Sequence, residues 1–457
     1  MGTGVTTTAG VRSLFGVRDY RHLFGAQVIA LLGTGLATVA LALLAYRLAG
    51  SRAGAVLGTA LVIKMVVYVT IAPIAGAYAD RLPRRWLLVG LDMVRALVVL
   101  ALPFVTSVWQ VYVLIGVLQA ASAAFTPTFQ AVLPDILPDQ RDYTRALSAS
   151  QLAASMETLL SPALAAAVLT VASFHWLFAG TTVGFVASAM LVATSTIPSA
   201  RPSDRTGPVD RIAAGMRIFA ATPRLRGVLG LNLAIAGAGA IVMVNTVNIV
   251  RDVLGGDDND VALLLAANGV GTIVVAACLP RLLDRVPERP VMLSGGIVLS
   301  AGAAGAVALS TVTLGEVRSV AAAVVWAVLG VGAGLVLTPV GRVLRRSARE
   351  ADRPAVFAAQ FSLSHACWLL SYPIAGYLVT SAGFTIGWLA LAALTVTGTV
   401  IAVAVWPRRD PVRLTHTHPA PPTGEGHLAD AIPAGAYTHT HEFIIDADHP
   451  RWPTPHG

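Results

Sequence analysis

The stretch GAYADRLPRRW, residues 76–86, places an Asp-Arg pair and two further arginines at the end of a long apolar run. The stretch LPRLLDRVPERP, residues 279–290, repeats the pattern Asp-Arg-x-Pro-x-Arg after another apolar run. Two more landmarks recur in the same order: Thr126-Pro127 returns as Thr338-Pro339, and Pro162 returns as Pro373. Three ordered matches at nearly one spacing predict that the two halves of the chain are copies of one another.

The composition is that of a membrane protein. Of the 457 residues, 55% are hydrophobic and only 12% are charged, whereas soluble domains average about 25% charged residues. The net charge is +8, but the arginines stand in short clusters between apolar runs, which favours a bilayer over a nucleic acid as the partner. The two cysteines, Cys278 and Cys367, both lie in apolar runs, so neither a disulfide framework nor a zinc site is indicated.

Twelve apolar runs are long enough to cross a bilayer as helices, which takes about 20 residues each. The predicted fold class is therefore an all-α membrane protein with twelve transmembrane helices. The runs lie near residues 22–49, 54–80, 86–107, 109–130, 145–172, 175–197, 226–251, 261–281, 290–312, 318–345, 355–380 and 383–406. The first run reads as a retained helix rather than a signal peptide.

The distribution of arginine predicts the orientation of these helices. If the N-terminus is inside, the outer loops carry only Arg47, Arg52, Arg251 and Arg318, and the great majority of the arginines lie inside. This bias predicts a multi-pass protein of the cell (plasma or inner) membrane with both termini in the cytoplasm.

Four regions follow from these runs. Residues 1–197 form an N-terminal six-helix bundle, and residues 226–406 form a C-terminal six-helix bundle. Residues 198–225 are polar and contain four prolines, which indicates a cytoplasmic linker loop. Residues 407–457 are rich in His and Pro without a sustained apolar period, which predicts a mostly disordered cytoplasmic tail.

The repeated loop also resembles a known family. GAYADRLPRR is similar to the signature loop of the major facilitator superfamily, Gly-x-x-x-Asp-Arg-x-Gly-Arg-Arg/Lys, with Pro83 in place of the usual glycine. LDMVRAL, which contains Asp92 and Arg95, and residues 145–169 are similar to the macrolide and siderophore exporter branch. The resemblance covers about residues 18–406. It implies a secondary active transporter built from two pseudo-symmetric six-helix bundles, which alternates between inward-open and outward-open states.

Two places depart from that branch. In LLGTGLA the chain has Thr34 near the position where the exporters usually carry an acid on the first helix. The antiporter pattern Gly-Pro-x-x-Gly-Gly of the fifth helix is replaced by SPALAA, residues 161–166.

The resemblance assigns the signature residues to a conformational switch. It implies that Asp80 meets the N-terminus of the eleventh helix, near Pro354, because free N–H groups there favour an anion. Gly76 would let another helix come close. The charged residues would form a network that latches one conformation; with their repeats they are Arg81, Arg84, Arg85, Asp92, Arg95, Asp284 and Arg285. The alternative is that the arginines only set the topology.

Three ionisable residues are expected near the middle of the membrane. Burying a charge there costs free energy, so such residues usually have a functional or structural role. They are Lys64, Glu157 and His365. The resemblance implies that spans two and eleven touch, as do spans five and eight, so that Lys64 approaches His365 and Glu157 approaches Asn268. Glu157 is a candidate proton carrier or cation contact. The alternatives are a structural ion pair with Lys64, and a hydrated cavity residue.

The remaining polar candidates each have two interpretations. His365 is either a packing histidine or part of a site, and Lys64 either neutralises Glu157 or binds an anionic substrate. Asn232 and Asn245 on the seventh span either line a cavity or hydrogen-bond between helices.

The tail contains most of the histidines. With nearby carboxylates they suit nickel, zinc, cobalt or copper, and they resemble the tails of nickel-resistance members of the superfamily. The candidate metal ligands are His416, His418, His439, His441, Asp446 and His449. The alternative is a solvated tail with a short docking segment, EFIIDADHPRWP, residues 442–453.

These observations predict proton-coupled efflux of a small molecule by a monomer, with the proton gradient as energy source, no cofactor and no nucleic-acid partner. One alternative is efflux of nickel, cobalt or zinc assisted by the tail, and another is a non-transporting membrane sensor or scaffold. An enzyme is not expected, because the sequence has no nucleophile elbow, phosphate-binding loop or metalloprotease helix.

Overall fold

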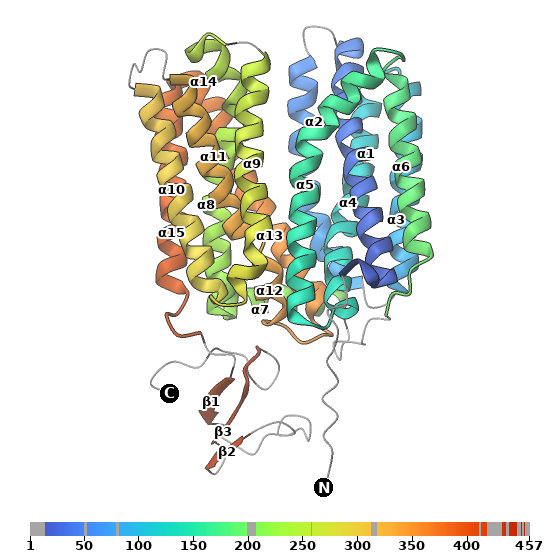
Figure 1. The fold of residues 1–457 in the computed structure, drawn as a ribbon. Helices are drawn as coiled ribbons and strands as arrows, with labels where there is room; N and C mark the ends of the chain where they lie inside the picture. Colours follow the sequence, from blue (N-terminus) through green and yellow to red (C-terminus); the bar gives the residue numbers. More distant parts are fainter. Residues whose placement is uncertain are drawn as a thin grey trace.

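The computed structural model describes residues 14–49, 53–78, 82–198, 207–256, 258–311, 318–410, 413–417, 432–435, 438–445, 449 and 452. Two bundles of long helices stand side by side in it, as Figure 1 shows. The N-terminal bundle begins with the 3-10 turn η1 (Leu14–Gly16), and a second such turn, η3 (Leu102–Phe104), follows its third helix. Its helices are α1 (Arg18–Ala49), α2 (Ala53–Tyr78), α3 (Arg84–Ala101), α4 (Val108–Ile136), α5 (Gln140–Leu169) and α6 (His175–Ala193).

The C-terminal bundle repeats this plan with more interruptions. Two of its helices continue into π-helical turns, η4 (Ile249–Leu254) after α8 and η6 (Ile374–Leu378) after α13. Its helices are α8 (Pro223–Asn248), α9 (Asp258–Leu283), α10 (Glu288–Thr311), α11 (Arg318–Leu337), the short α12 (Val340–Arg345), α13 (Arg353–Pro373), the short α14 (Val379–Ala382) and α15 (Phe384–Val405).

The lipid environment explains why long apolar runs become helices, since a helix satisfies every interior backbone donor and acceptor within one segment. Ten of the described helices have both the length and the hydropathy of a membrane span. Two more, α5 and α13, are as long but more polar, and they pack across the boundary between the bundles, α5 against α9 and α13 against α2. The predicted all-α fold with two six-helix bundles is confirmed.

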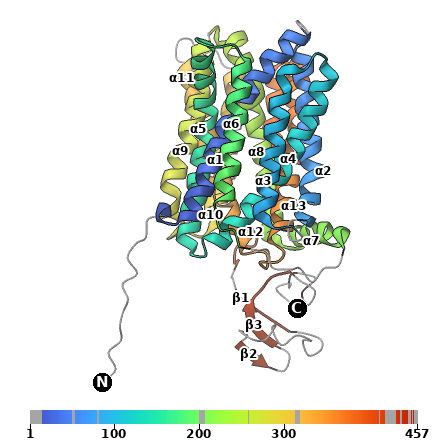
Figure 2. The same cartoon turned by 90° about the vertical axis from the view of Figure 1, so that its right-hand side faces the viewer.

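The linker between the bundles contains a helix that the sequence did not predict. Within the region expected to be a loop, 198–225, α7 (Pro208–Ala221) packs against both α2 and α13, and α8 already begins at Pro223. Figure 2 shows α7 at the end of the molecule where the strands of the tail also lie. This end is called the tail face below.

The described part of the tail contains a small sheet rather than the disorder expected there. Its strands are β1 (Arg413–Thr417), β2 (Ile432–Gly435) and β3 (Thr438–Glu442), in the antiparallel order β1-β3-β2. Phe443 and Ile445, directly after β3, are buried and belong to the apolar core of the C-terminal bundle. The predicted docking segment is therefore seated on the protein itself.

Arg224, at the start of α8, holds the tail to the bundle. Its buried side chain forms an ion pair with Asp410 at 3.2 Å and donates a hydrogen bond to Ser347 at 2.9 Å. The guanidinium group lies 5.0 Å from the centre of the Trp452 ring. Arg346 forms a second ion pair with Asp410. The arginines satisfy Asp410, and the aromatic residues cover the apolar base of the bundle.

Candidate functional site

The two bundles meet closely where α2 faces the start of α13. A Cβ atom on Gly76 would lie 3.0 Å from the carbonyl oxygen of Pro354 and would overlap the side chain of Ala358. Only glycine allows this approach. As predicted, α13 begins close to Pro354, at Arg353. Asp80 and Arg81, the expected partners of this helix end, lie outside the described residues.

Asp135, near the end of α4, is an acid that joins the two bundles. One carboxylate oxygen accepts a hydrogen bond from Arg84 of the same bundle at 2.6 Å, and the other accepts one from Arg353 of the C-terminal bundle at 2.8 Å. Arg84 is buried, in agreement with a structural role beyond topology. Asp135 was missed by sequence reasoning, although LPDILPD, residues 133–139, sets two acids among prolines at a helix end.

Further contacts cross the boundary between the bundles at this end, which is called the seam below, and two of them come from α12. Arg342 donates to the hydroxyl of Thr144 at 3.1 Å, and Arg345 donates to the carbonyl oxygen of Pro138 at 2.7 Å. Asp284 of the repeated loop forms an exposed ion pair of 3.6 Å with Arg141. All of these contacts lie at the tail face, so they hold the two bundles together there.

The other signature residues stand apart from the seam. Asp92 and Arg95 form an ion pair inside the N-terminal bundle, and Ser188 donates a hydrogen bond to Asp92 at 2.7 Å. The Arg95 guanidinium lies 4.1 Å from the Phe125 ring centre and 4.6 Å from that of Phe185. The predicted single charge network is therefore two separate ones, because the aromatic rings enclose this pair within its own bundle.

The last two signature arginines have no contact across the seam in the described residues. Arg85 is half-buried with its guanidinium 5.0 Å from the centre of the Trp86 ring. Arg285 is exposed next to Asp284. Both fit the alternative in which arginines only mark the topology.

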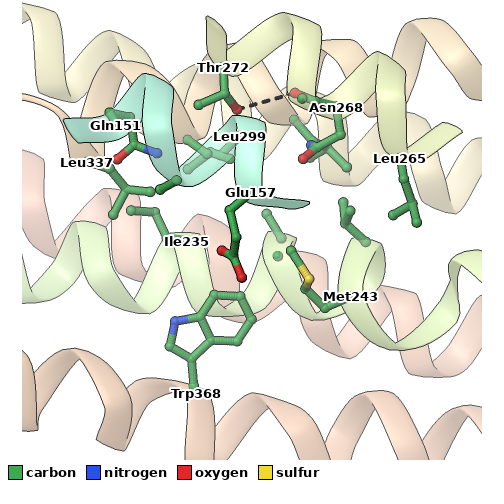
Figure 3. Close-up of a pocket in the computed structure, with 17 residues that line it drawn as sticks. Gln151, Glu157, Ile235, Met243, Leu265, Asn268, Thr272, Leu299, Leu337 and Trp368 are labelled. Atoms are coloured by element: carbon green, nitrogen blue, oxygen red, sulfur yellow. Dashed lines mark hydrogen bonds between the residues drawn. The ribbon is translucent and has the colours of Figure 1, made fainter. Parts of the chain in front are cut away.

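A cavity of about 290 Å³ lies between the bundles. From the N-terminal bundle, α5 contributes Gln151, Ala154 and Glu157; the other walls come from α8, α9, α10, α11 and α13 and are mainly apolar. Glu157 and Asn268, which the family resemblance implied to approach one another, both line this cavity. Figure 3 shows the Glu157 carboxylate directed towards the indole of Trp368.

A second cavity of about 350 Å³ adjoins the first and shares Gln151 and Trp368 with it. Its polar walls are uncharged amides and hydroxyls apart from the imidazole of His365. They comprise Gln27, Thr126, Gln130, Ser150, Gln151, Asn232, Thr338, Gln360, Ser364 and His365. The first cavity is mainly apolar and the second is mainly polar. Among the described residues that line the two cavities, Glu157 is the only acid.

The structural ion pair between Glu157 and Lys64 is not formed among the described residues, where neither side chain has an ion-pair partner within 4.0 Å. Lys64 is half-buried, with its ammonium group 5.5 Å from the centre of the Tyr68 ring. The same tyrosine packs against His365, with ring centres 4.7 Å apart. Tyr68 therefore contacts both Lys64 and His365, which the family resemblance implied to approach one another.

The remaining candidates are held by hydrogen bonds. His365 Nδ1 lies 2.7 Å from the carbonyl oxygen of Phe361. Asn232 donates to Gln360 at 3.1 Å while lining the second cavity. Asn245 donates to the carbonyl oxygen of Ala375 at 3.0 Å and accepts from Trp388 at 3.1 Å, which makes it a contact between helices.

The predicted metal ligands of the tail are only partly described. His418 and Asp446 lie outside the described residues, and of His416, His439 and His441 only the backbone is described. The strand register pairs His416 with His439. His449 is buried against Phe443, with ring centres 4.7 Å apart. Among the described residues no group of three metal-ligating side chains occurs.

Comparison with known proteins identifies the class. The model of the Major Facilitator Superfamily matches residues 23–247 and 227–433, so the chain belongs to this superfamily of membrane transporters. Membership in this family indicates a transporter rather than an enzyme.

The chain is also similar to particular members. It is 24% identical over 242 residues to an uncharacterized MFS-type transporter, YfiS, of Bacillus subtilis, covering 52% of this chain and 57% of that protein. It is 25% identical over 181 residues to macrolide efflux protein A of Streptococcus pyogenes, covering 38% of this chain and 44% of the relative. The chain thus spans about half the length of the curated relatives it matches.

Solved structures share the fold at low sequence identity. The human organic anion transporter MFSD10 (TETRAN) superposes with a TM-score of 0.71 at 13% identity, covering 84% of this chain and 99% of that one. The proton:xylose symporter XylE superposes with a TM-score of 0.67 at 12% identity, covering 85% of this chain and 96% of that one. These likenesses concern the fold alone.

Proposed function

We propose that this transporter exports an apolar small molecule with a positive charge in exchange for protons, by alternating access of the cavity between the bundles. The observation that carries the proposal is Glu157, the single acidic side chain lining the described cavities. A carboxylate that either binds a proton or attracts a cation exchanges one for the other, which is the elementary step of antiport. The apolar walls around it favour an apolar substrate.

Export as the direction of transport is supported by the similarity to macrolide efflux proteins. The arginine bias supports placing the tail face in the cytoplasm of a cell that carries the protein in its plasma or inner membrane. In this orientation the contacts of Asp135, Arg342 and Arg345 close the cytoplasmic entrance. They have to break for the substrate to enter from that side.

The test is efflux from vesicles that contain the purified protein as a monomer. An imposed pH gradient should drive transport of a lipophilic cation such as ethidium by the wild type. Glu157→Gln removes the titrating group at nearly constant volume and should abolish gradient-driven flux. The matched control Asp210→Asn changes an exposed acid on α7, outside the cavities, and should keep full activity. Full activity in Glu157→Gln would contradict the proposal.

A second candidate, tail-assisted efflux of nickel, cobalt or zinc, is favoured by one observation. The register of β1 and β3 sets His416 opposite His439, and imidazole is a common ligand of these ions. Deleting residues 411–457 should then raise cellular sensitivity to at least one of these metals. Unchanged tolerance to all three would remove this candidate and leave the first intact.

A further inference from the structure

A row of buried ion pairs begins near the start of the tail and continues into the C-terminal bundle. Asp410 pairs with Arg346, which follows α12. Arg346 in turn lies 3.7 Å from a carboxylate oxygen of Glu288, the first residue of α10. The other carboxylate oxygen of Glu288 forms an ion pair of 2.9 Å with Arg342 of α12. These four residues, Asp410, Arg346, Glu288 and Arg342, are called the ion-pair row below.

The far end of the ion-pair row crosses the seam. The guanidinium group of Arg342, held by Glu288, donates a hydrogen bond of 3.1 Å to the hydroxyl of Thr144 on α5, in the N-terminal bundle. Arg342 and Arg346 are one helical turn apart, so a single carboxylate can align both of them. The helix α12 itself packs against α5 of one bundle and against α8 and α13 of the other. Glu288 therefore links the start of the tail to a contact between the bundles.

The docking segment, residues 442–453, covers the near end of the ion-pair row. Phe443 is 2% exposed within the core of the C-terminal bundle, and its carbonyl oxygen accepts a hydrogen bond of 3.5 Å from Arg224, the second partner of Asp410. The ring of Trp452 lies against the same guanidinium group. Attraction between charges grows where water is excluded, whereas a solvated pair contributes little. Loss of the docking segment would expose Asp410 and its partners to water and weaken the first link of the row.

We propose that the docked tail is a built-in restraint on the separation of the two bundles at the tail face. By enclosing Asp410, the docking segment fixes Arg346 and Glu288, and Glu288 aligns Arg342 for its contact across the seam. When the docking segment leaves its seat, the guanidinium group of Arg342 gains other positions and the bundles part more readily. This inference goes beyond the proposed function, because it concerns how often the tail face opens and not which substrate passes.

The test is a distance across the seam, measured by double electron–electron resonance on the full chain in lipid nanodiscs. Nitroxide labels replace Arg145 of α5 and Leu282 of α9, both exposed, in a cysteine-free background. Phe443→Ser removes the apolar anchor of the docking segment. It should raise the fraction of separated molecules about fivefold, at the lower end of the usual coupling between two sites. The matched control Phe443→Leu keeps an apolar side chain and should retain the wild-type distances.

A double-mutant cycle tests the route from the tail to the seam. Glu288→Gln should raise the separated fraction by a similar factor while the tail stays docked, because Arg224 and Asp410 are unchanged. Adding Phe443→Ser to Glu288→Gln should have little further effect, because both changes interrupt the same row. Arg346→Gln interrupts the row one link earlier and should give the same result.

Three results would overturn the inference. They are an unchanged or smaller separated fraction in Phe443→Ser, wild-type distances in both Glu288→Gln and Arg346→Gln, and full additivity in the cycle, which would mean that the tail acts by another route. Deleting residues 411–457 keeps Asp410 and removes the docking segment in a second way, so it should match Phe443→Ser. Because the measurement needs no substrate, its failure would leave the proposed function standing.

Discussion

Asp135 of α4 and Arg353 of α13 form an ion pair of 2.8 Å that joins the two bundles at the tail face. The same carboxylate is held by Arg84 at 2.6 Å, so the acid is fixed by its own bundle before it meets the other. A prepositioned acid loses little side-chain freedom when the bundles meet. It can therefore serve as a contact that forms and breaks during each transport cycle.

Replacing this acid should open the tail face. Asp135→Asn removes the charge from a hydrogen bond to a charged group, a change of about 1.5–3 kcal/mol, and should shift the population of closed molecules by roughly 10- to 100-fold. The measurement is maleimide labelling of a cysteine placed at Thr144, which is buried in the closed seam, in a cysteine-free background. Arg141→Gln, which breaks only an exposed ion pair with Asp284, is the control and should label slowly. Equal labelling of both variants would show that Asp135 has no special part in closure.

The close approach of α2 and α13 gives a second prediction. Gly76→Val should push the helices apart, because even a Cβ atom at this position overlaps Ala358. Labelling at residue 144 should rise, and flux should fall. Gly90→Val is the matched control, since a Cβ atom there has no neighbour within 4 Å. A Gly76→Val protein with wild-type labelling and flux would contradict the argument.

The enclosed pair of Asp92 and Arg95 predicts an effect on stability instead. Arg95→Leu leaves a carboxylate buried without its cation, which costs about 3–5 kcal/mol in comparable cases. The melting temperature in detergent should fall clearly, while labelling at residue 144 should stay that of the wild type. A variant that melts at the wild-type temperature but labels rapidly would show that Asp92 and Arg95 belong to the conformational switch.

The docked tail predicts a difference between two neighbouring arginines. Arg224→Gln removes the ion pair with Asp410 and the cation–π contact with Trp452, so the tail should leave the bundle more often. Limited chymotrypsin digestion should then cleave faster after Phe443, which is buried against the bundle when the tail is docked. Arg226→Gln, on the exposed side of the same turn, should digest as the wild type does. Identical digestion of both variants would mean that Arg224 does not hold the tail.

The pattern of apolar runs predicted the helices closely because a bilayer leaves few alternatives to a helix. The predicted span 226–251 corresponds to α8, Pro223–Asn248, and the span 383–406 to α15, Phe384–Val405. The linker helix α7 was missed because its apolar residues are too few for a membrane span. The strands of the tail were missed because segments of only four or five residues carry almost no periodic signal.

The cavity shows where sequence reasoning ended. Glu157 was a candidate because a deep acid is conspicuous in an apolar run, and the family resemblance implied that it approaches Asn268; both residues line the first cavity. Trp368 gave no such signal, since an aromatic residue in an apolar helix reads as ordinary packing. The position of the Trp368 ring depends on Gly239, 129 positions earlier in the chain, because the glycine makes room for the edge of the indole.

The sequence by itself determined the class of fold, the duplication and the residues that are costly to bury, because hydropathy and charge are local properties of the chain. Only the tertiary structure decided which charges face one another. It separated Asp92 and Arg95 from the contact between the bundles, joined Asp135 to Arg353 across that contact, and placed Glu157 and Trp368 in the lining of one cavity. The physical reason is that helix packing, not the order of residues along the chain, fixes the distances over which charges and rings interact.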